Sequence, residues 1–156
     1  MLICLLNAQK ERGDIMSVDK NTAMKLWDDI FGSNITFAQD CFGIWICKLD
    51  YGDGESTRER NKGAGYFNYG WDIDHIRPKA SYENEKDADF YNNYEPMHKN
   101  NNQQKSDNYP HFEVNGKKYK VVQCEICKRH ETKGYGVLDV NKNVRIDWKG
   151  KKNLYY

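Results

Sequence analysis

The chain has 156 residues, of which 38% are hydrophobic, 13% aromatic and 30% charged. This length fits one domain with a modest core, and the aromatic content argues against a disordered chain. The net charge of +1 hides an uneven distribution: residues 116–156 hold eleven Lys or Arg and four Asp or Glu, against thirteen and nineteen in residues 1–115. A basic C-terminal segment over 116–156 fits either a polyanionic partner or a solvated lysine-rich tail.

The N-terminal sequence MLICLLNA lacks a basic start, and its apolar run is too short for a signal peptide or a membrane span. Five irregularly spaced cysteines do not suggest a disulfide framework. We therefore expect a cytoplasmic protein without membrane contact. Met16 begins a clearer domain start, so we interpret residues 1–15 as an extension of a single domain that spans 1–156.

The first half of the chain predicts two helices and a loop. Apolar residues recur at helical spacing from Thr22 to Phe31, with Asp19 or Asn21 as N-cap and Gly32 as the stop. A second helix is predicted over residues 36–48, where two apolar stripes indicate burial on more than one side. Its cysteines, Cys41 and Cys47, are expected only to pack. Residues 50–70 are rich in glycine and charge and predict a loop, whose basic residues could contact phosphates or simply be solvated.

The second half predicts short strands around one helix. Residues 71–76 read as a strand, 94–97 as an extended piece and 100–106 as a short polar helix that ends before Pro110. Residues 119–123, 135–140 and 144–148 alternate or carry β-branched side chains, and the sequence VNKNV predicts a hairpin turn between the last two.

The segment from Trp71 to Asn108 carries the side chains with the clearest chemistry. Hydrolysis of a phosphodiester needs an activated water and neutralisation of the charge that develops on phosphorus. One hard cation on few protein oxygens can supply the second, and a histidine of near-neutral pKa the first. Asp74 and Asn102 offer the oxygens and His75 the base, because adjacent side chains at a strand end point to opposite sides. Asn93 can hydrogen-bond the backbone near His75.

These residues resemble a known family. The sequences DHIRP, NYEPMH and NNQQKSDN, in this order and spacing, are similar to the HNH endonucleases of the ββα-metal superfamily, and the flanking AQDCFG and DNYPHFEVNGKKY to small stand-alone bacterial and phage members. The resemblance covers residues 19–123. It implies His75 as general base, Asp74 and Asn102 as metal ligands, and Asn93 as the structural middle asparagine. His98 stands where many relatives carry a zinc-knuckle cysteine, and Asn101 stands at the partner position.

The resemblance implies an α+β fold: N-terminal helices against a ββα-metal core over 71–108, followed by a small antiparallel C-terminal β element. It also implies a DNA endonuclease that uses Mg²⁺, Mn²⁺ or a similar cation, with RNA not excluded. Arg77, His98 and Lys105 are the candidate substrate contacts, although Arg77 could point outward and His98 could only pack. A single such site cuts one strand, so double-strand cleavage requires a homodimer or two events.

Two other classes compete with the nuclease. One is a non-catalytic nucleic-acid-binding module of HNH shape. The other is a zinc-stapled interaction protein, in which Cys124, Cys127 and His130 would need a fourth ligand from Cys41, Cys47 or His111. A CxxC pair without a matching second pair is usually incidental, so no structural zinc ion is expected.

Overall fold

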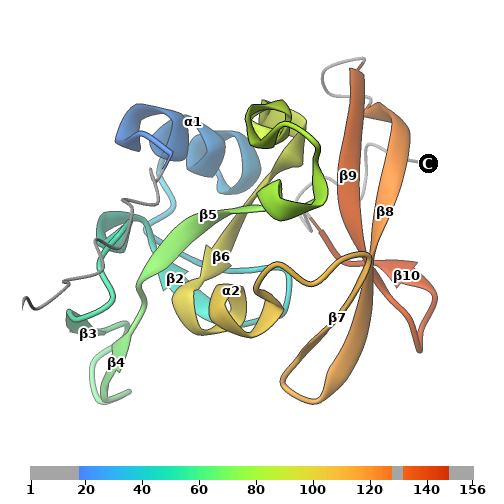
Figure 1. Cartoon of the computed structure of the whole chain (residues 1–156). Helices are drawn as coiled ribbons and strands as arrows, with labels where there is room; N and C mark the ends of the chain where they lie inside the picture. The colour runs from blue at the N-terminus through green and yellow to red at the C-terminus, as the bar shows by residue number, and fades with distance from the viewer. Residues whose placement is uncertain (1–17, 128–131, 148–156) are drawn as a thin grey trace, which may run out of the picture.

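The computed structural model describes residues 18–127 and 132–147, and its architecture is α+β in the coarse sense expected (Figure 1). Its two α-helices accompany small antiparallel sheets, and short 3₁₀ turns connect several of them. The helices and strands are α1 Lys20–Phe31, β1 Phe37–Gln39, β2 Trp45–Cys47, β3 Thr57–Glu59, β4 Tyr66–Asn68, β5 Trp71–His75, β6 Tyr94–His98, α2 Lys99–Lys105, β7 His111–Val114, β8 Lys117–Cys127, β9 Thr132–Asp139 and β10 Val144–Arg145.

The centre of the molecule is the antiparallel hairpin β5–β6, which leads directly into α2. Its register pairs Trp71 with His98 at one end and His75 with Tyr94 at the other. Figure 1 shows α1 and α2 on opposite sides of this hairpin. The strands predicted over 71–76 and 94–97 and the helix predicted over 100–106 are confirmed, with shifts of one residue at their ends.

The helix α1 covers one face of the hairpin, as its apolar spacing predicts. Asp19 caps its N-terminus by accepting a hydrogen bond from the Thr22 N–H at 3.0 Å, and Gly32 follows its last residue. The Trp27 ring packs against the Trp71 ring with centroids 5.2 Å apart, and both side chains are fully buried. Two such indoles supply much of the apolar area that holds helix to strand.

The helix predicted over residues 36–48 is wrong. The segment forms the hairpin β1–β2, in which Phe37 pairs with Cys47, followed by a 3₁₀ turn over Lys48–Asp50. Gly43 has a φ of +90° and Asp40 accepts the backbone N–H groups of Phe42 and Ile44, so the chain reverses at the point where a helix would continue. Cys41 and Cys47 are free and buried, as expected.

Two further strand pairs escaped the sequence interpretation. The predicted loop over 50–70 contains the hairpin β3–β4, which pairs Thr57 with Asn68. The strand β7 also was not predicted, and it joins the C-terminal strands as the edge of a four-stranded sheet of order β10-β9-β8-β7. The C-terminal antiparallel β element and its turn after Asp139 are confirmed.

A second apolar cluster lies between the C-terminal sheet and the end of β5. Ile76 packs there with buried residues of the sheet, and Phe42 from the β1–β2 turn joins them. No helix among residues 18–127 and 132–147 is long and apolar enough to cross a membrane. The strand predicted over 144–148 is shorter than expected, because β10 covers only Val144–Arg145 and residues 146–147 are not part of it. The proposed extension over 1–15, residue His130 and residue 148 lie outside the described residues.

Candidate functional site

A cleft of about 560 Å³ opens where β5 ends against α2. It is lined by Asp74, His75 and Asn102, three of the residues predicted to carry the chemistry. Its other charged lining residues are Asp72, Lys79, Glu85 and Asp107. With four carboxylates and one lysine, the cleft favours a cation over an unaccompanied phosphate.

Asp74 and His75 lie on opposite faces of the hairpin because successive strand residues alternate. Ile73, two residues before His75, packs in the cluster under α1, whereas Asp74 reaches Lys105 of α2. The ring of His75 stands edge-on to that of Tyr94, with centroids 5.2 Å apart. The divergence expected from the sequence is therefore present.

Asp74 is buried and has one charged partner, Lys105. Its Oδ1 accepts a hydrogen bond from Lys105 Nζ at 3.2 Å. Its Oδ2 lies 3.0 Å from the same nitrogen but accepts no hydrogen bond from any described residue, since the approach is poorly directed. Burial raises the pKa of the Asp74 carboxyl above its ordinary value, and the Lys105 ammonium offsets this only in part.

Lys105 was a candidate substrate contact, and the structure places its side chain in the interior beside Asp74. Its side chain is fully buried, Nζ also donates to the His75 carbonyl oxygen at 3.1 Å, and the ammonium lies 5.5 Å from the centroid of the Phe112 ring. An ammonium with no water contact needs such partners to remain charged. Lys105 is thus the internal counter-ion of Asp74.

His75 is held by Asp89, a residue that the sequence interpretation did not single out. The Nε2 atom of His75 lies 2.7 Å from Asp89 Oδ1, and Lys79 Nζ lies 3.1 Å from the same oxygen. Burial raises the pKa of the Asp89 carboxyl, but hydrogen bonds from His75 and Lys79 outweigh it and leave that pKa below its ordinary value. An ionised Asp89 places the imidazole proton on Nε2, so Nδ1 keeps its lone pair as an acceptor.

Asn93 fixes the backbone that follows His75. Its Oδ1 accepts the Arg77 N–H at 2.8 Å, and its Nδ2 donates to the carbonyl oxygens of Arg77 and Ala88, each at 3.0 Å. The side chain is fully buried. Gly134 of β9 packs against the neighbouring Asn92, where a Cβ would come within 2.9 Å of the Asn92 Cβ and carbonyl oxygen. Asn93 therefore has the backbone-holding position that the sequence predicted.

Asn102 lines the cleft from α2 and is half-buried. Its backbone oxygen accepts the Ser106 N–H, while its side chain makes no hydrogen bond to residues in the described ranges. An amide group at the cleft without an internal partner remains available as a donor or as an oxygen ligand.

His98 and Arg77 were the other candidate substrate contacts, and their surroundings give them structural roles. The buried His98 caps α2, because Nδ1 accepts the Asn100 N–H at 3.1 Å while Nε2 lies 3.1 Å from the Asn68 carbonyl oxygen. Arg77 neither points outward nor lines the cleft. Its guanidinium donates to Ser81 Oγ, to the Ser81 carbonyl and to the Tyr135 hydroxyl.

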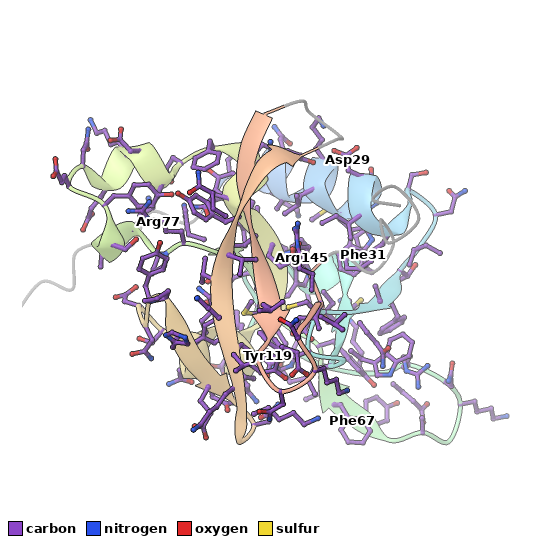
Figure 2. The ribbon with its side chains drawn as sticks, turned by 90° about the vertical axis from the view of Figure 1, so that its right-hand side faces the viewer. Asp29, Phe31, Phe67, Arg77, Tyr119 and Arg145 are labelled. Atoms are coloured by element: carbon purple, nitrogen blue, oxygen red, sulfur yellow. The ribbon has the colours of Figure 1, made fainter. Side chains whose placement is uncertain are left out.

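Aromatic rings surround the Arg77 guanidinium as well. It lies 4.0 Å from the centroid of the Tyr82 ring and 5.2 Å from that of Tyr109. Figure 2 shows Arg77 beside the turns that follow β5 and at the flank of the C-terminal sheet. Arg77 therefore ties the segment after His75 to that sheet.

The residues present can accept one hard cation. Within residues 18–127 and 132–147, no group of three or more His, Cys, Asp and Glu side chains is arranged to hold a metal ion. A cation that keeps most of its water needs only one or two protein oxygens. Asp74 Oδ2, buried without a hydrogen bond, and the Asn102 amide oxygen at the same cleft fit that requirement.

The described candidates for the fourth ligand of the alternative zinc site are Cys41, Cys47 and His111. Burial, with further contributions from Glu95 and Asp40, raises the pKa of the Cys41 thiol well above its ordinary value, which disfavours the thiolate that zinc requires. Burial likewise raises the pKa of Cys47. His111 is exposed on β7, and the side chains of Cys124, Cys127 and His130 lie outside those described.

No sequence pattern identified Asp89 and Lys79 as the residues that hold His75. Asp89 and Lys79 lie in a polar segment without periodicity, and nothing there marks which carboxylate faces His75. Comparison of the chain with protein-family models, curated proteins and solved structures gave no match. The functional conclusion therefore depends on the site geometry and on the motif together.

Proposed function

We propose that this protein is a metal-dependent endonuclease of the HNH type that hydrolyses phosphodiester bonds in DNA. The observation that carries the proposal is that Asp74, His75 and Asn102 line one cleft. The hairpin β5–β6 followed by α2 supplies the order of elements that a ββα-metal core requires.

In this proposal His75 is the general base. Asp89 holds the proton on Nε2, and Nδ1 accepts a proton from the attacking water. The imidazolium that forms is stabilised by the ionised Asp89, in the way that a buried carboxylate supports a catalytic histidine elsewhere. Asn93 keeps the backbone after His75 fixed, so the ring is presented at a constant angle to the cleft.

Asp74 and Asn102 would hold Mg²⁺ or Mn²⁺. When bound, this cation supplies charge stabilisation to the phosphorane and to the leaving oxygen. Lys105 keeps Asp74 paired in the absence of the cation, and Oδ2, which is buried and accepts no hydrogen bond from the described residues, is the carboxylate oxygen that the cation would bind in place of the Lys105 contact.

The exposed face of β7 and β8 would bind the nucleic-acid backbone. His111, Lys118 and Lys120 are exposed there, whereas the alternate residues Phe112 and Tyr119 are buried. The register pairs His111 with Lys120 and the exposed Glu113 with Lys118, so the face carries two lysines and one carboxylate on neighbouring strands. Lysines on this face would contact phosphates and make binding sensitive to salt.

The experiment is nicking of supercoiled plasmid with Mg²⁺ or Mn²⁺ by the wild type and by His75→Ala. We expect the variant to cut about 10²- to 10⁴-fold more slowly, the range that general base catalysis supplies. EDTA should stop the wild type. Equal rates for the two proteins would overturn the assignment of His75.

A non-catalytic nucleic-acid-binding module is the second candidate. The observation in its favour is the Asp74–Lys105 pair, which lets the fold neutralise Asp74 without any metal. A wild type that binds DNA or RNA but cuts neither, with any of the divalent cations, would favour this candidate.

A further inference from the structure

Asp40 is a buried carboxylate that lies in the turn between β1 and β2, outside the residues that line the cleft. Its exposed fraction is 1%. A carboxylate in such a place is costly unless hydrogen bonds replace its water. The identity of its partners therefore indicates which part of the structure requires it.

The two oxygens of Asp40 serve two different segments. Oδ1 accepts the backbone N–H groups of Phe42 and Ile44, each at 3.0 Å, and closes its own turn. Oδ2 accepts the His98 N–H at 3.1 Å and the Asn101 Nδ2 at 2.7 Å, which lie 58 and 61 residues further along the chain. One side chain thus connects the β1–β2 turn to the start of α2.

The helix α2 depends on such polar connections to an unusual degree. It has seven residues, KNNNQQK, and only Asn101 and Lys105 of these are buried. A helix this short is not stable alone, and this one presents no apolar stripe to a core. Asn101 is held by Asp40 and Lys105 by Asp74, so these two carboxylates anchor the helix at two points.

Additional hydrogen bonds come from the β7–β8 turn. Gln104 Nε2 donates to Asn115 Oδ1 at 3.0 Å, and Gln104 Oε1 accepts the Asn115 N–H at 2.8 Å. These bonds involve exposed groups, and water can replace them. The buried bond to Asp40 has no such substitute.

We propose that Asp40 is a positioning residue, which acts through Asn101 to fix the place of Asn102 relative to Asp74. Asn102 follows Asn101 directly, so a shift or rotation of the first turn of α2 moves the amide that faces the cleft. The inference rests on the proposed function for what Asn102 does there, but the connection itself is independent of catalysis. A purely structural Asp40 would stabilise the fold without any particular effect on α2.

The test uses Asp40→Asn, which keeps the shape and can keep both Oδ1 bonds. Its new NH₂ group then faces the Asn101 amide and the His98 N–H, so donors meet donors. A double variant, Asp40→Asn/Asn101→Asp, restores a donor–acceptor pair in the reverse sense. Asn101→Ala breaks the same connection from the helix side and leaves Asp40 its three backbone bonds.

Asp139→Asn is the matched control. Asp139 is also a buried aspartate of a hairpin turn, and it accepts the N–H groups of Asn141 and Lys142, but the hydrogen bonds described for it do not reach α2. Any effect that comes only from the loss of a buried turn carboxylate should appear in this variant too.

Two measurements decide the matter: Mn²⁺ affinity by electron paramagnetic resonance, and amide hydrogen exchange of α2. We expect Asp40→Asn and Asn101→Ala to weaken Mn²⁺ binding about 10-fold, a typical effect of a side chain that orients a metal ligand. Both should also raise exchange at Ser106, whose N–H bonds the Asn102 carbonyl. The double variant should recover most of each loss, and Asp139→Asn should show neither.

Unchanged exchange in α2 and unchanged Mn²⁺ affinity in Asp40→Asn would overturn the proposal, as would equal effects in Asp139→Asn. The two proposals fail in different ways. A wild type without Mn²⁺ binding at Asp74 sinks the proposed nuclease, and the exchange data alone then decide whether Asp40 positions the helix. If Asp40→Asn does not fold, Asn101→Ala provides the test. Hydrogen exchange in α2 and Mn²⁺ affinity equal to those of the wild type in Asn101→Ala would then overturn the proposal.

Discussion

Two buried aspartates contact α2, and their surroundings differ in kind. Asp40 has four hydrogen bonds, two on each oxygen, all from uncharged N–H groups. Asp74 has a single cationic partner, Lys105, and its Oδ2 accepts no hydrogen bond from the described residues. Burial leaves the pKa of Asp74 raised in spite of that partner.

The contrast indicates what each carboxylate is for. A fully bonded carboxylate such as Asp40 has no capacity left for a ligand and can act only through the groups that it bonds. Asp74 has a buried oxygen without a hydrogen bond from the described residues beside a cleft, and under the proposed function a cation would complete its contacts. Under this division Asp40 holds α2 at Asn101, whereas Asp74, which holds it at Lys105, also belongs to the proposed metal site. Substitutions at the two ends of α2 should therefore differ in their effects on cutting and on stability.

The largest effect is expected from Asp74→Ala. Cutting should fall by about 10³-fold, since several kcal/mol of metal-derived charge stabilisation are lost. The free energy of unfolding should fall by about 3–5 kcal/mol, because Lys105 is left buried without its counter-charge. Plasmid nicking and urea denaturation measure the two quantities.

The double variant Asp74→Ala/Lys105→Met separates these two consequences. It removes both charges, so most of the lost stability should return while cutting stays as slow as in Asp74→Ala. Recovery of cutting in the double variant would show that Asp74 acts only by neutralising Lys105, and the distinction between the two aspartates would collapse.

The second prediction contrasts Asn102→Ala with His98→Ala. Asn102→Ala should lower metal-dependent cutting about 100-fold and change stability by less than about 0.5 kcal/mol, because its side chain is half-buried and has no hydrogen bond to a described residue. His98→Ala should lower stability by about 1–3 kcal/mol, because it uncaps α2 and leaves the Asn68 carbonyl oxygen without its partner. Thermal denaturation and nicking rates are measured on both variants. A loss of stability in Asn102→Ala together with a loss of cutting in His98→Ala would contradict the roles given to the two residues.

The third prediction concerns Asp89→Asn. The variant should cut about 10-fold more slowly, because the amide no longer favours a proton on His75 Nε2 or stabilises the imidazolium. The pKa of Asp89 is lowered in the fold, so its contribution to stability is present above the unfolded value of about 3.9 and is lost as the pH falls through the lower folded value. Because Asp89 is partly exposed, that contribution is below about 1 kcal/mol.

Denaturation at pH 6 and at pH 3 measures this pH dependence. The wild type should lose slightly more stability than Asp89→Asn over that interval. Identical losses would mean that the Asp89 contacts do not persist in solution, and the orientation of His75 would then need another source.

Much of the cleft was predictable because its residues are marked locally. Asp74 and His75 end an apolar strand and Asn102 lies in the middle of a short polar helix, so strand and helix patterns alone bring them to neighbouring elements. Packing was one of the two alternatives for His98, but the burial of Lys105 was not predictable, because lysines are usually exposed and their burial depends on contacts across the fold. Asp89 and Asp40 were missed since hydrogen bonds over 14 and 58 residues leave no period in the sequence.

The fold itself shows the same limit. The spacing of Ala23, Trp27 and Ile30 predicts α1 because one face of it is buried on the hairpin. Residues 36–48 have apolar residues at spacings that suit a helix, but the turn at Asp40 depends on Asp40 side-chain hydrogen bonds that spacing does not reveal. The short strand β7 is defined by its partner β8 and has too few residues to form a pattern.

The smallest effect, on DNA binding, is expected from substitutions on the exposed face of β7 and β8, which contacts neither Asp40 nor Asp74. Lys118→Gln/Lys120→Gln should weaken DNA binding only a few-fold at physiological salt, since each lysine contributes one phosphate contact among several. The informative quantity is the slope of log K against log salt, which should become shallower by about 2 when two phosphate contacts are lost. Fluorescence anisotropy with a labelled duplex over a range of KCl concentrations measures it.

Lys20→Gln/Lys25→Gln removes the same charge elsewhere, from two exposed lysines of α1. Its slope should match that of the wild type, whereas equal changes in both double variants would mean that binding follows net charge and not the β7–β8 face. Cutting by Lys118→Gln/Lys120→Gln at saturating DNA should remain near the wild-type rate, because this face positions the backbone and takes no part in the chemistry at Asp74 and His75. A loss of rate at saturation would instead extend the functional end of α2 onto the C-terminal sheet.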